Sequence, residues 1–343
     1  MPNQVLENLK TLLQVPDLAS KKWIYEQYDS QVMNDTIQTG GDAAIVRVHG
    51  TQKALAISTD CTPRYVEADA FEGAKQAVAE TYRNISAVGG KPLAITNCLN
   101  FGNPQKPEIM GQIVRAIKGI TEASKILDYP VVSGNVSLYN ETDGKAIKPT
   151  PAIGGVGLLK NFNKRCDINF KNEGDVIFIV GKTLGHINES LFEHEILKEK
   201  SKKNPPKVDL LEERKHGEFI RELIEASEIN ACHDISDGGL LVALFEMCGK
   251  NLGCEIDLSE LKTQEEISDI DENHLFFGED QSRYIVALDP HLIKEFKKKS
   301  EAKSIPVFRV ATVIKEKIKI SDAEIEVKEL QFVNQAVLSK KFS

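Results

Sequence analysis

The sequence predicts an α+β fold divided between two domains, roughly residues 1–162 and 170–343. At 343 residues the chain is long enough for about two domains, and its 41% hydrophobic content can build a substantial core. Helical and strand-like periodicities occur in both parts of the chain. A polar stretch, residues 160–175, separates them and has the composition of an inter-domain connection.

In the first domain, leucines at positions 6, 9, 12 and 13 predict a helix over residues 5–28. Apolar runs predict strands at 43–48 and 53–58, joined by a His-Gly turn. An Ala-rich helix is expected over 71–88, stopped by two glycines. A strand at 93–96, a polar loop at 97–107, a helix over 108–127 and strands at 130–132 and 152–159 complete the domain.

The second domain is expected to open with a strand at 176–180. Helices are predicted over 189–199, 210–227 and 238–250, with strands at 284–288 and 305–312. The charged, proline-broken segment 200–206 is interpreted as a surface loop. The Lys-rich run 294–303 is interpreted as the solvated face of a helix.

Composition narrows the class of protein. A net charge of -8 and a pI near 5.6 argue against a broad nucleic-acid-binding face. No apolar run approaches the roughly 20 residues of a membrane span, and the first ten residues lack a signal-peptide pattern. The six cysteines form no CxxC pair, so we expect reduced thiols rather than a zinc site. Together these features predict a cytoplasmic protein.

Five segments place glycine beside polar residues at or near the ends of predicted strands. They are GGD at 40–42, STD at 58–60, TNCLNFGNP at 96–104, SGNVS at 133–137 and HDISDGG at 233–239. Glycine lets a backbone amide approach a phosphate, and Asp or Asn oxygens are ligands that suit Mg²⁺. Each segment alone is equally consistent with an ordinary turn. No Walker P-loop, GxSxG elbow, HExxH helix or kinase HRD segment is present.

Taken together, these motifs resemble one family. TDCTPRY at 59–65, NCLNFGNP at 97–104, KPEIM at 106–110 and PVVSGNVSLYNE at 130–141 are similar to the large, synthetase subunit of phosphoribosylformylglycinamidine synthase. This family belongs to the ATP-binding superfamily of aminoimidazole ribonucleotide synthetase and selenophosphate synthetase. The segments 233–240 and 278–283 extend the resemblance over nearly the whole chain. It implies an N-terminal-type domain, whose sheet pairs into a barrel-like interface, followed by a C-terminal-type α+β domain.

The resemblance also implies roles for individual residues. Gly134 would contact ATP, Asn135 would contribute to a Mg²⁺ site, and Ser137 would touch the ribonucleotide substrate. Asn97 stands where the family often has an ATP-binding aspartate, and its uncharged amide pairs less strongly with a cation. Asp60 occupies the place of a metal-binding acid, for which an ordinary turn or cap remains the alternative.

Other polar residues are open to two interpretations. Asp42 would face the same auxiliary cleft as Asp60. Asp234 and Asp237 could bind magnesium or cap the helix that follows them, and we favour the cap. Asp280 replaces a serine in a segment that contacts substrate in the family's other half, where a carboxylate would repel phosphate. His233 has no obvious partner in the sequence, so we interpret it as a surface or capping histidine.

The function that the resemblance implies is an ATP-dependent carbon–nitrogen ligation in de novo purine biosynthesis. Formylglycinamide ribonucleotide, ammonia released from glutamine, and ATP would give formylglycinamidine ribonucleotide, ADP and phosphate. The cofactors would be ATP and Mg²⁺. The catalytic histidine of the family lies in the first half of a chain about twice this length, so we expect no catalytic residue here and little activity from this chain alone.

The implied partners are the first half of the synthetase, a glutaminase subunit and a small bridging subunit, with a homodimer as a further possibility. Whether the chain is a natural split subunit or a fragment is left open. Two other functions also stay open. One is a complete homodimeric ATP enzyme acting on another acceptor, which would be active alone. The other is a non-catalytic nucleotide-binding or scaffold subunit, which would stay inactive beside the other half.

Overall fold

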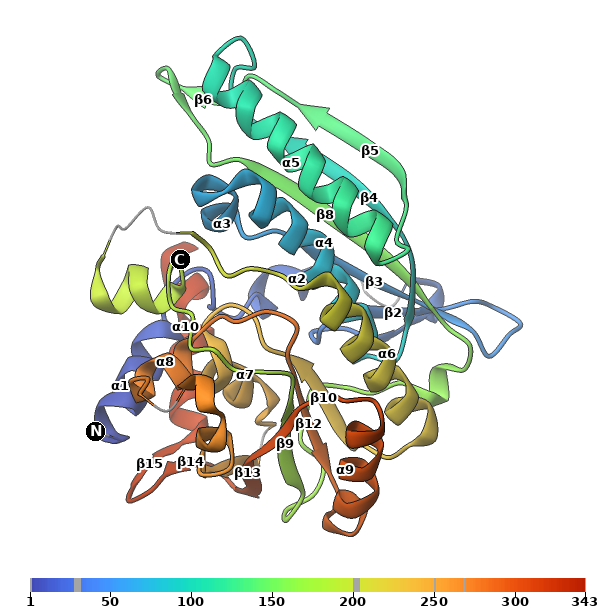
Figure 1. Ribbon diagram of the computed structural model, residues 1–343, viewed down its shortest axis with the longest axis vertical. Coiled ribbons are helices and arrows are strands. Elements are labelled where there is room, and N and C mark those ends of the chain that lie inside the picture. Colours follow the sequence, from blue (N-terminus) through green and yellow to red (C-terminus); the bar gives the residue numbers. More distant parts are fainter. Residues whose placement is uncertain (1, 28–31, 200–203, 250, 268, 343) are drawn as a thin grey trace.

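Two β-sheets organise the chain in the computed structural model, which describes residues 2–27, 32–199, 204–249, 251–267 and 269–342 (Figure 1). The first sheet has the strand order β1-β2-β3-β8-β4-β5. Its strands are β1 (Thr36–Gln38), β2 (Ala44–Arg47), β3 (Ala54–Asp60), β4 (Lys91–Asn100), β5 (Val131–Ser137) and β8 (Thr150–Leu159). All pairs are antiparallel except β4 with β5, which are parallel and joined through helix α5 (Pro107–Ile126).

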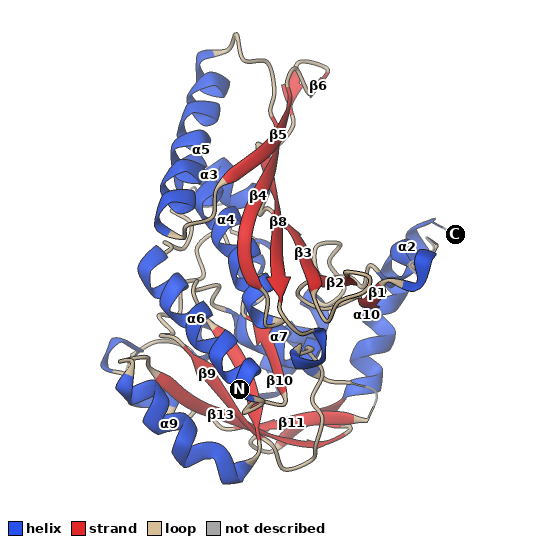
Figure 2. Ribbon diagram, turned by 90° about the vertical axis from the view of Figure 1, so that its right-hand side faces the viewer, coloured by secondary structure: helices blue, strands red, loops and turns tan. Residues whose placement is uncertain are grey.

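Helices α3 (Pro63–Ala68), α4 (Ala70–Ala87) and α5 lie on one side of this sheet (Figure 2). Within the described chain no helix lies over β4 and β8 on the opposite side, where the side chains of β8 are only half-buried. We call these two sides the helix face and the open face. A small hairpin of β6 (Glu141–Thr142) and β7 (Lys145–Ala146) follows β5.

Helix α4 is the centre of the structure, because it packs against the first sheet, against α5 and against α6 (Leu210–Ala226) of the second part. Its small alanines allow close packing, and most of its residues are buried. Asp69 caps its N-terminus by accepting hydrogen bonds from the amides of Phe71 and Glu72. At Gly119 of α5 an added Cβ would lie 2.1 Å from the Phe71 carbonyl oxygen, so only glycine permits this helix crossing.

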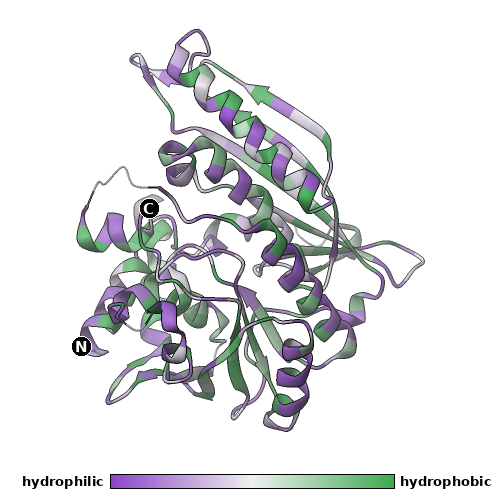
Figure 3. Ribbon diagram, viewed as in Figure 1, coloured by the Kyte–Doolittle hydropathy of each residue, from purple (hydrophilic) through white to green (hydrophobic). Residues whose placement is uncertain are grey.

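The second sheet has the strand order β10-β12-β9-β13-β11-β14-β15. Its strands are β9 (Val176–Val180), β10 (Ala231–Asp234), β11 (Leu252–Ile256), β12 (Tyr284–Leu288), β13 (Val307–Lys315), β14 (Lys317–Ile320) and β15 (Ala323–Glu326). Pairing is antiparallel except between β11 and β14. Strands β9 and β12 are buried throughout and carry the hydrophobic colour in Figure 3. Helices α7 (Gly239–Met247), α8 (Glu272–Phe277), α9 (Ile293–Ala302) and α10 (Val327–Phe342) surround it.

The N-terminal helix is shorter than predicted. Helix α1 covers Pro2–Leu12, turns follow to Ser20, and a short helix α2 covers Lys22–Tyr25, so the prediction of one helix over 5–28 was wrong. Pro16 cannot donate the amide hydrogen that a continuous helix requires there. Residue 28 lies outside the described residues. Leu6, Leu9 and Leu12 are buried in the core of the second sheet, although the sequence assigned them to the first domain.

Two polar segments predicted as loops or turns are strands. Strand β4 continues through Asn97 to Asn100, and β5 continues through the SGNVS segment to Ser137. Their parallel pairing holds both segments extended. The predicted helix at 189–199 is a single π-helical segment, Phe192–Leu197. None of the helices in the described ranges is both long enough and apolar enough to cross a bilayer.

Candidate functional site

Three of the predicted site residues lie in one row across the first sheet. Asp60 on β3 is in register with Ile153 on β8, Ile153 with Asn97 on β4, and Asn97 with Gly134 on β5. Ile153 belongs to the core under the helices, and side chains in register share a face, so this row points to the helix face. Adjacent strands are about 4.8 Å apart, which puts Asp60 and Asn97 roughly 10 Å from each other.

Asn97 and Gly134 are in direct contact. A Cβ at position 134 would come within 2.2 Å of Asn97 Oδ1, so the amide occupies the space that any larger residue would need. The side chain of Asn97 makes no hydrogen bond with the described residues, and its donor and acceptor are free for a ligand. β5 is the last strand of the sheet and leaves this place exposed: Val132 and Val136, two residues before and after Gly134, are 71% and 59% exposed.

The other two predicted residues lie on the open face. Asn135 is in register with Cys98, and its Nδ2 lies 3.7 Å from the Cys98 sulfur. Ser137 is in register with Asn100, and its hydroxyl donates to Asn140 Oδ1 at 3.3 Å. The structure therefore brings Asn135 and Ser137 together on one face of β5, and Asn97 and Gly134 on the other. Only a ligand lying across the edge of β5 would meet both pairs.

Asp60 ends strand β3 in an environment that disfavours its negative charge. The Ser58 hydroxyl donates to Oδ2 at 2.5 Å, and Asn84 Nδ2 donates to Oδ1 at 3.0 Å. Burial raises the pKa of Asp60 to about 7, and the charge of Asp234 adds to this, although the two hydrogen bonds act in the opposite direction. A cation placed here would stabilise the ionised carboxylate.

A second carboxyl group, Glu80 of α4, adds to this concentration of negative charge. Burial raises the pKa of Glu80 well above its usual range, and the charges of Asp60, Asp237 and Asp234 raise it further. Arg83 opposes them, and it is the cation that lowers the pKa of both Glu80 and Asp60. Acids from both sheets therefore converge on the junction between β3, α4 and the end of β10.

Arg83 joins the two parts of the chain through a buried network. Its guanidinium bonds Glu213 Oε2 at 3.0 Å, Asp234 Oδ2 at 3.2 Å and Gln281 Oε1 at 3.1 Å, and its side chain is fully buried. Burying these charges is favourable only while they stay paired. The network therefore fixes α4 of the first part against β10 and α6 of the second.

Arg64 also connects the two parts of the chain through ion pairs. Arg64 of α3 bonds Asp237 at 2.5 Å and Glu279 at 2.8 Å, and Tyr65 donates to the same Glu279 carboxylate. Asp234 and Asp237 thus pair with arginines of the first part. Neither caps α7, whose N-terminus makes no side-chain cap bond, so the cap interpretation was wrong.

His233 also connects the two parts. Its Nδ1 lies 2.5 Å from Asp42 Oδ1 and its Nε2 lies 3.1 Å from Glu246 Oε2. Burial alone would lower the pKa of His233, but the two carboxylates outweigh burial and raise the pKa well above its usual range. Burial raises the pKa of Asp42 to about 6. His233 is thus a buried bridging residue, contrary to the surface or capping role predicted for it.

Two groups of side chains in the described ranges hold ligand atoms close enough to share one metal ion. They are Asp42, His233 and Asp234, and Glu189, Glu193 and His194. Each group is held by hydrogen bonds of its own, such as Glu189 to His194 at 2.9 Å. Asp60 belongs to neither group. Mg²⁺ commonly keeps several waters and binds through one or two carboxylates plus substrate phosphates. Asp60 could therefore be a Mg²⁺ ligand without belonging to such a cluster.

Sequence reasoning missed Glu80, Arg83 and the bridging role of His233. Glu80, Arg83 and Asn84 follow one another at positions i, i+3 and i+4 of a helix whose other residues are mostly small and apolar. Three polar residues on one side of a buried helix indicate partners in the interior. The identity of those partners was not visible, because Arg83 and Asp234 are separated by 151 residues.

Two family models match the chain in order. One describes the AIR synthase related protein, N-terminal domain, over residues 40–159, and the other its C-terminal domain, over residues 172–323. The chain belongs to the AIR synthase related family. This membership, with the two sheets described above, confirms the predicted fold class.

Curated relatives of the chain include PurL subunits of phosphoribosylformylglycinamidine synthase, as the sequence motifs predicted. A PurL from Novosphingobium aromaticivorans is 57% identical over 285 residues, which are 81% of this chain and 38% of the relative. A PurL from Zymomonas mobilis is 49% identical over 342 residues, which are 97% of this chain and 45% of the relative. The chain thus spans less than half the length of these relatives.

The fold is shared with a solved PurL from Thermotoga maritima in complex with FGAR. The two superpose with a TM-score of 0.77 at 19% identity, over 95% of this chain and 53% of that one. The same PurL has also been solved with ADP and with ATP. At this level of identity the likeness concerns the fold.

Proposed function

We propose that the chain is one half of the synthetase component of phosphoribosylformylglycinamidine synthase, an ATP-dependent carbon–nitrogen ligase of purine biosynthesis. It would act on formylglycinamide ribonucleotide and ammonia derived from glutamine, with ATP and Mg²⁺. One observation carries this proposal: the chain is 49% identical to a PurL over 97% of its own length. The same alignment covers only 45% of that relative, which is why we propose one half of the component. A protein of this function would work in the cytoplasm.

The arrangement of β3, β4 and β5 supports roles for five residues. Asn97 and Gly134 would bind ATP: the free Asn97 amide offers both a donor and an acceptor, and the bare backbone of Gly134 lets a phosphate approach closely. Asn135 and Ser137 lie around the edge of the same strand. Asn135 would offer an oxygen to Mg²⁺, and Ser137 would bond the ribonucleotide.

Asp60 is the further metal ligand in this proposal. Its carboxyl group lies among Glu80, Asp234 and Asp237, so a divalent cation there would relieve repulsion that Arg83 only partly offsets. Carboxylate oxygens are the ligands that Mg²⁺ takes most readily. The chemistry that bound Mg²⁺ supplies is neutralisation of phosphate charge, and the residues of this chain hold and orient the ligands.

The open face of the first sheet supports a requirement for a second synthetase unit. Ile57 and Leu93 are 40% and 43% exposed in the first sheet, and the hydrophobic side chains of β8 on the open face are half-buried. An exposed sheet face of this kind is stabilised when another sheet covers it. We infer that the occupant is the equivalent sheet of the first half, and that a glutaminase and a small bridging subunit join the assembly. A second copy of this chain would be the substitute when the first half is absent.

The division of the chain into residues 1–162 and 170–343 belongs to the same proposal. The segment between the two sheets, from the end of β8 to the start of β9, contains only one short helical turn, Phe162–Lys164. The leading helix α1 would then be an arm of the first unit that packs on the second, as its buried leucines indicate.

Ligand binding tests this proposal. Titration calorimetry would measure the binding of formylglycinamide ribonucleotide (FGAR) in the presence of Mg²⁺ and a non-hydrolysable ATP analogue. The proteins are this chain, the remaining half of a PurL, and an equimolar mixture of the two. We expect binding only in the mixture. Ser137→Ala should weaken it by about 10- to 100-fold, the value of a hydrogen bond to a charged group. Ser133→Ala, on the same face of β5 but four residues away, is the matched control and should bind normally. Equal binding by this chain alone would contradict the need for a second half.

A further inference from the structure

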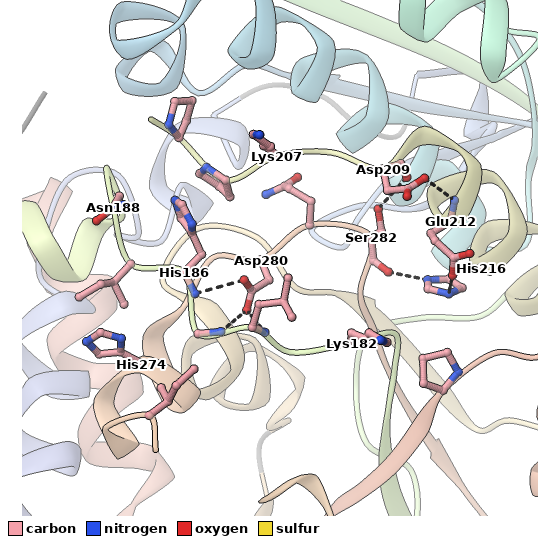
Figure 4. Close-up of a pocket in the computed structure, with 18 of the residues that line it drawn as sticks. Lys182, His186, Asn188, Lys207, Asp209, Glu212, His216, His274, Asp280 and Ser282 are labelled. Atoms are coloured by element: carbon pink, nitrogen blue, oxygen red, sulfur yellow. Dashed lines mark hydrogen bonds and ion pairs between the residues drawn. The ribbon is translucent and has the colours of Figure 1, made fainter. Parts of the chain in front are cut away.

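A cavity of about 1270 Å³ lies in the second part of the chain, and none of its lining residues belongs to the first sheet (Figure 4). Its wall includes the loop 182–188, the start of α6 and the segment 280–282 that precedes β12. Lys182, Lys207 and Lys215 contribute positive charge to the wall. Lys182 is paired with Glu266 at 2.7 Å and Lys215 with Glu212 at 3.4 Å. Lys207 has no ion-pair partner among the residues that the structure describes.

Three consecutive backbone amides on this wall point at a single carboxylate. The amides of Leu184 and Gly185 each donate to Asp280 Oδ2 at 2.9 Å, and the amide of His186 donates to Oδ1 at 3.1 Å. Gly185 has a φ of +70°, in the left-handed region where glycine is favoured, and this conformation turns the successive amides to one side. Asp280 is 4% exposed, so its charge is balanced by these three bonds and by the buried Arg283, whose Nη1 lies 3.8 Å from Oδ2, rather than by water.

Consecutive amides that converge in this way form a concave anion-binding loop, the device by which many proteins hold phosphate. Here the oxygens of Asp280 occupy the position that phosphate oxygens would take. We propose that residues 184–186 form an anion-binding loop whose anion position is filled by Asp280, so that Asp280 excludes phosphate from this cavity. Asp280 then determines which ligands the cavity admits, and its replacement by a short neutral residue opens the loop to a free phosphate group.

A second carboxylate on the same wall provides a matched comparison. Asp209 caps α6 by accepting hydrogen bonds from the amides of Leu211 and Glu212, at 3.0 and 3.1 Å. Removing either carboxylate changes the charge of the cavity by the same amount, but only Asp280 fills the loop 184–186. If charge alone excluded phosphate, the two replacements would have the same effect.

The experiment measures binding of inorganic phosphate to the full chain by equilibrium dialysis at constant ionic strength. The proteins are the wild type, Asp280→Ser and Asp209→Ser. We expect Asp280→Ser to bind phosphate at least about tenfold more tightly than the wild type and sulfate to compete with it. Asp209→Ser should not differ from the wild type. The proposal fails if all three proteins bind alike, or if Asp209→Ser gains as much affinity as Asp280→Ser.

Asp280→Ser removes the partner of the amides of residues 184–186, and a second measurement covers the case in which this variant unfolds in chloride buffer. In that case refolding is the readout, followed by far-ultraviolet circular dichroism. Phosphate at about 10 mM should restore the folded signal, whereas chloride of equal ionic strength should not. General stabilisation by salt needs higher concentrations than this. Failure of phosphate to restore it overturns the proposal. No purine ligand is used, so either outcome is independent of the proposed ligase function.

Discussion

The side-chain amide of Asn97 fills the space above Gly134, where a Cβ would lie 2.2 Å from Asn97 Oδ1. The two residues are paired in register on adjacent parallel strands, so a side chain at position 134 would displace the amide of Asn97 from its present place. The local packing of β4 against β5 and the proposed nucleotide site therefore involve the same two residues.

Gly134→Ala is expected to destabilise the chain by about 1–3 kcal/mol, the usual cost of forcing a methyl group into filled space. The reason is specific to Asn97, so the same substitution in an Asn97→Ala background should cost less than about 0.5 kcal/mol. Urea unfolding of the four proteins measures this double-mutant cycle. Gly111→Ala on α5 is the control, because no atom lies within 4 Å of its added Cβ, and it should stabilise the helix by about 0.5–1 kcal/mol. Equal costs in both backgrounds would show that Asn97 is not the obstacle.

Mg²⁺ is expected to stabilise the wild-type chain and to have little effect on Asp60→Asn. At 10 to 100 times the dissociation constant, a bound ion adds about 1.4–2.7 kcal/mol to the free energy of unfolding. Thermal unfolding with increasing MgCl₂ measures the effect. Asp322→Asn, which removes an exposed carboxylate, should respond as the wild type does. An unchanged Mg²⁺ response in Asp60→Asn would remove Asp60 from the proposed metal site.

Arg83→Met is expected to destabilise the chain by about 3–5 kcal/mol, because it leaves Glu213 and Asp234 buried without their cation. The measurement is the midpoint of urea unfolding at neutral pH. Arg214→Met breaks the exposed pair with Glu218 and should cost less than about 1 kcal/mol. A loss as small for Arg83 as for Arg214 would mean that the network does not hold the two parts together.

The bridge at His233 predicts a loss of stability with rising pH. Its pKa in the folded chain is well above the ordinary 6.5, so the folded state binds the proton more tightly than the unfolded state. The stabilisation is therefore complete below pH 6.5 and is lost as pH rises through the folded pKa. Asp42, whose pKa of about 6 is also raised, adds a loss of the same sign between about pH 4 and 6.

Urea unfolding between pH 6 and 9 measures this dependence. The wild type should lose stability over the range, and His233→Gln, which cannot carry the proton, should show a smaller slope. Glu246 and Asp234 also face His233, so Glu246→Gln should reduce the slope without abolishing it. A wild type whose stability rises with pH above 7, or a His233→Gln variant with an unchanged slope, would contradict the prediction.

Elements with an unambiguous local pattern could be predicted from the sequence. The continuous apolar runs at Val176–Val180 and Tyr284–Leu288 were predicted to the residue, because a fully buried strand needs no other signal. The predictions for α4 and α5 were within two residues of the observed ends. Short strands such as β10 and β14, whose formation depends on distant partners, were missed.

The candidate site was predicted less completely, for a related reason. Gly134, Asn135 and Ser137 have the composition of a turn, and only the register with β4 makes them a strand with alternating faces. The burial of Arg83 and the bridging of His233 depend on contacts between the two sheets, which leave no local pattern. Family resemblance suggested the residues of the candidate site, whereas the sequence pattern alone left each segment open to interpretation as a turn.

The most direct test of the proposed function is the rate of formylglycinamidine ribonucleotide formation from FGAR, Mg·ATP and ammonia. It is measured for this chain alone, for the remaining half of a PurL alone, and for the two mixed in equal amounts. We expect turnover in the mixture and none above background in either half, with the mixture's turnover falling when this chain carries Ser137→Ala. Full turnover by this chain alone, or an inactive mixture of two correctly folded halves, would contradict the assignment.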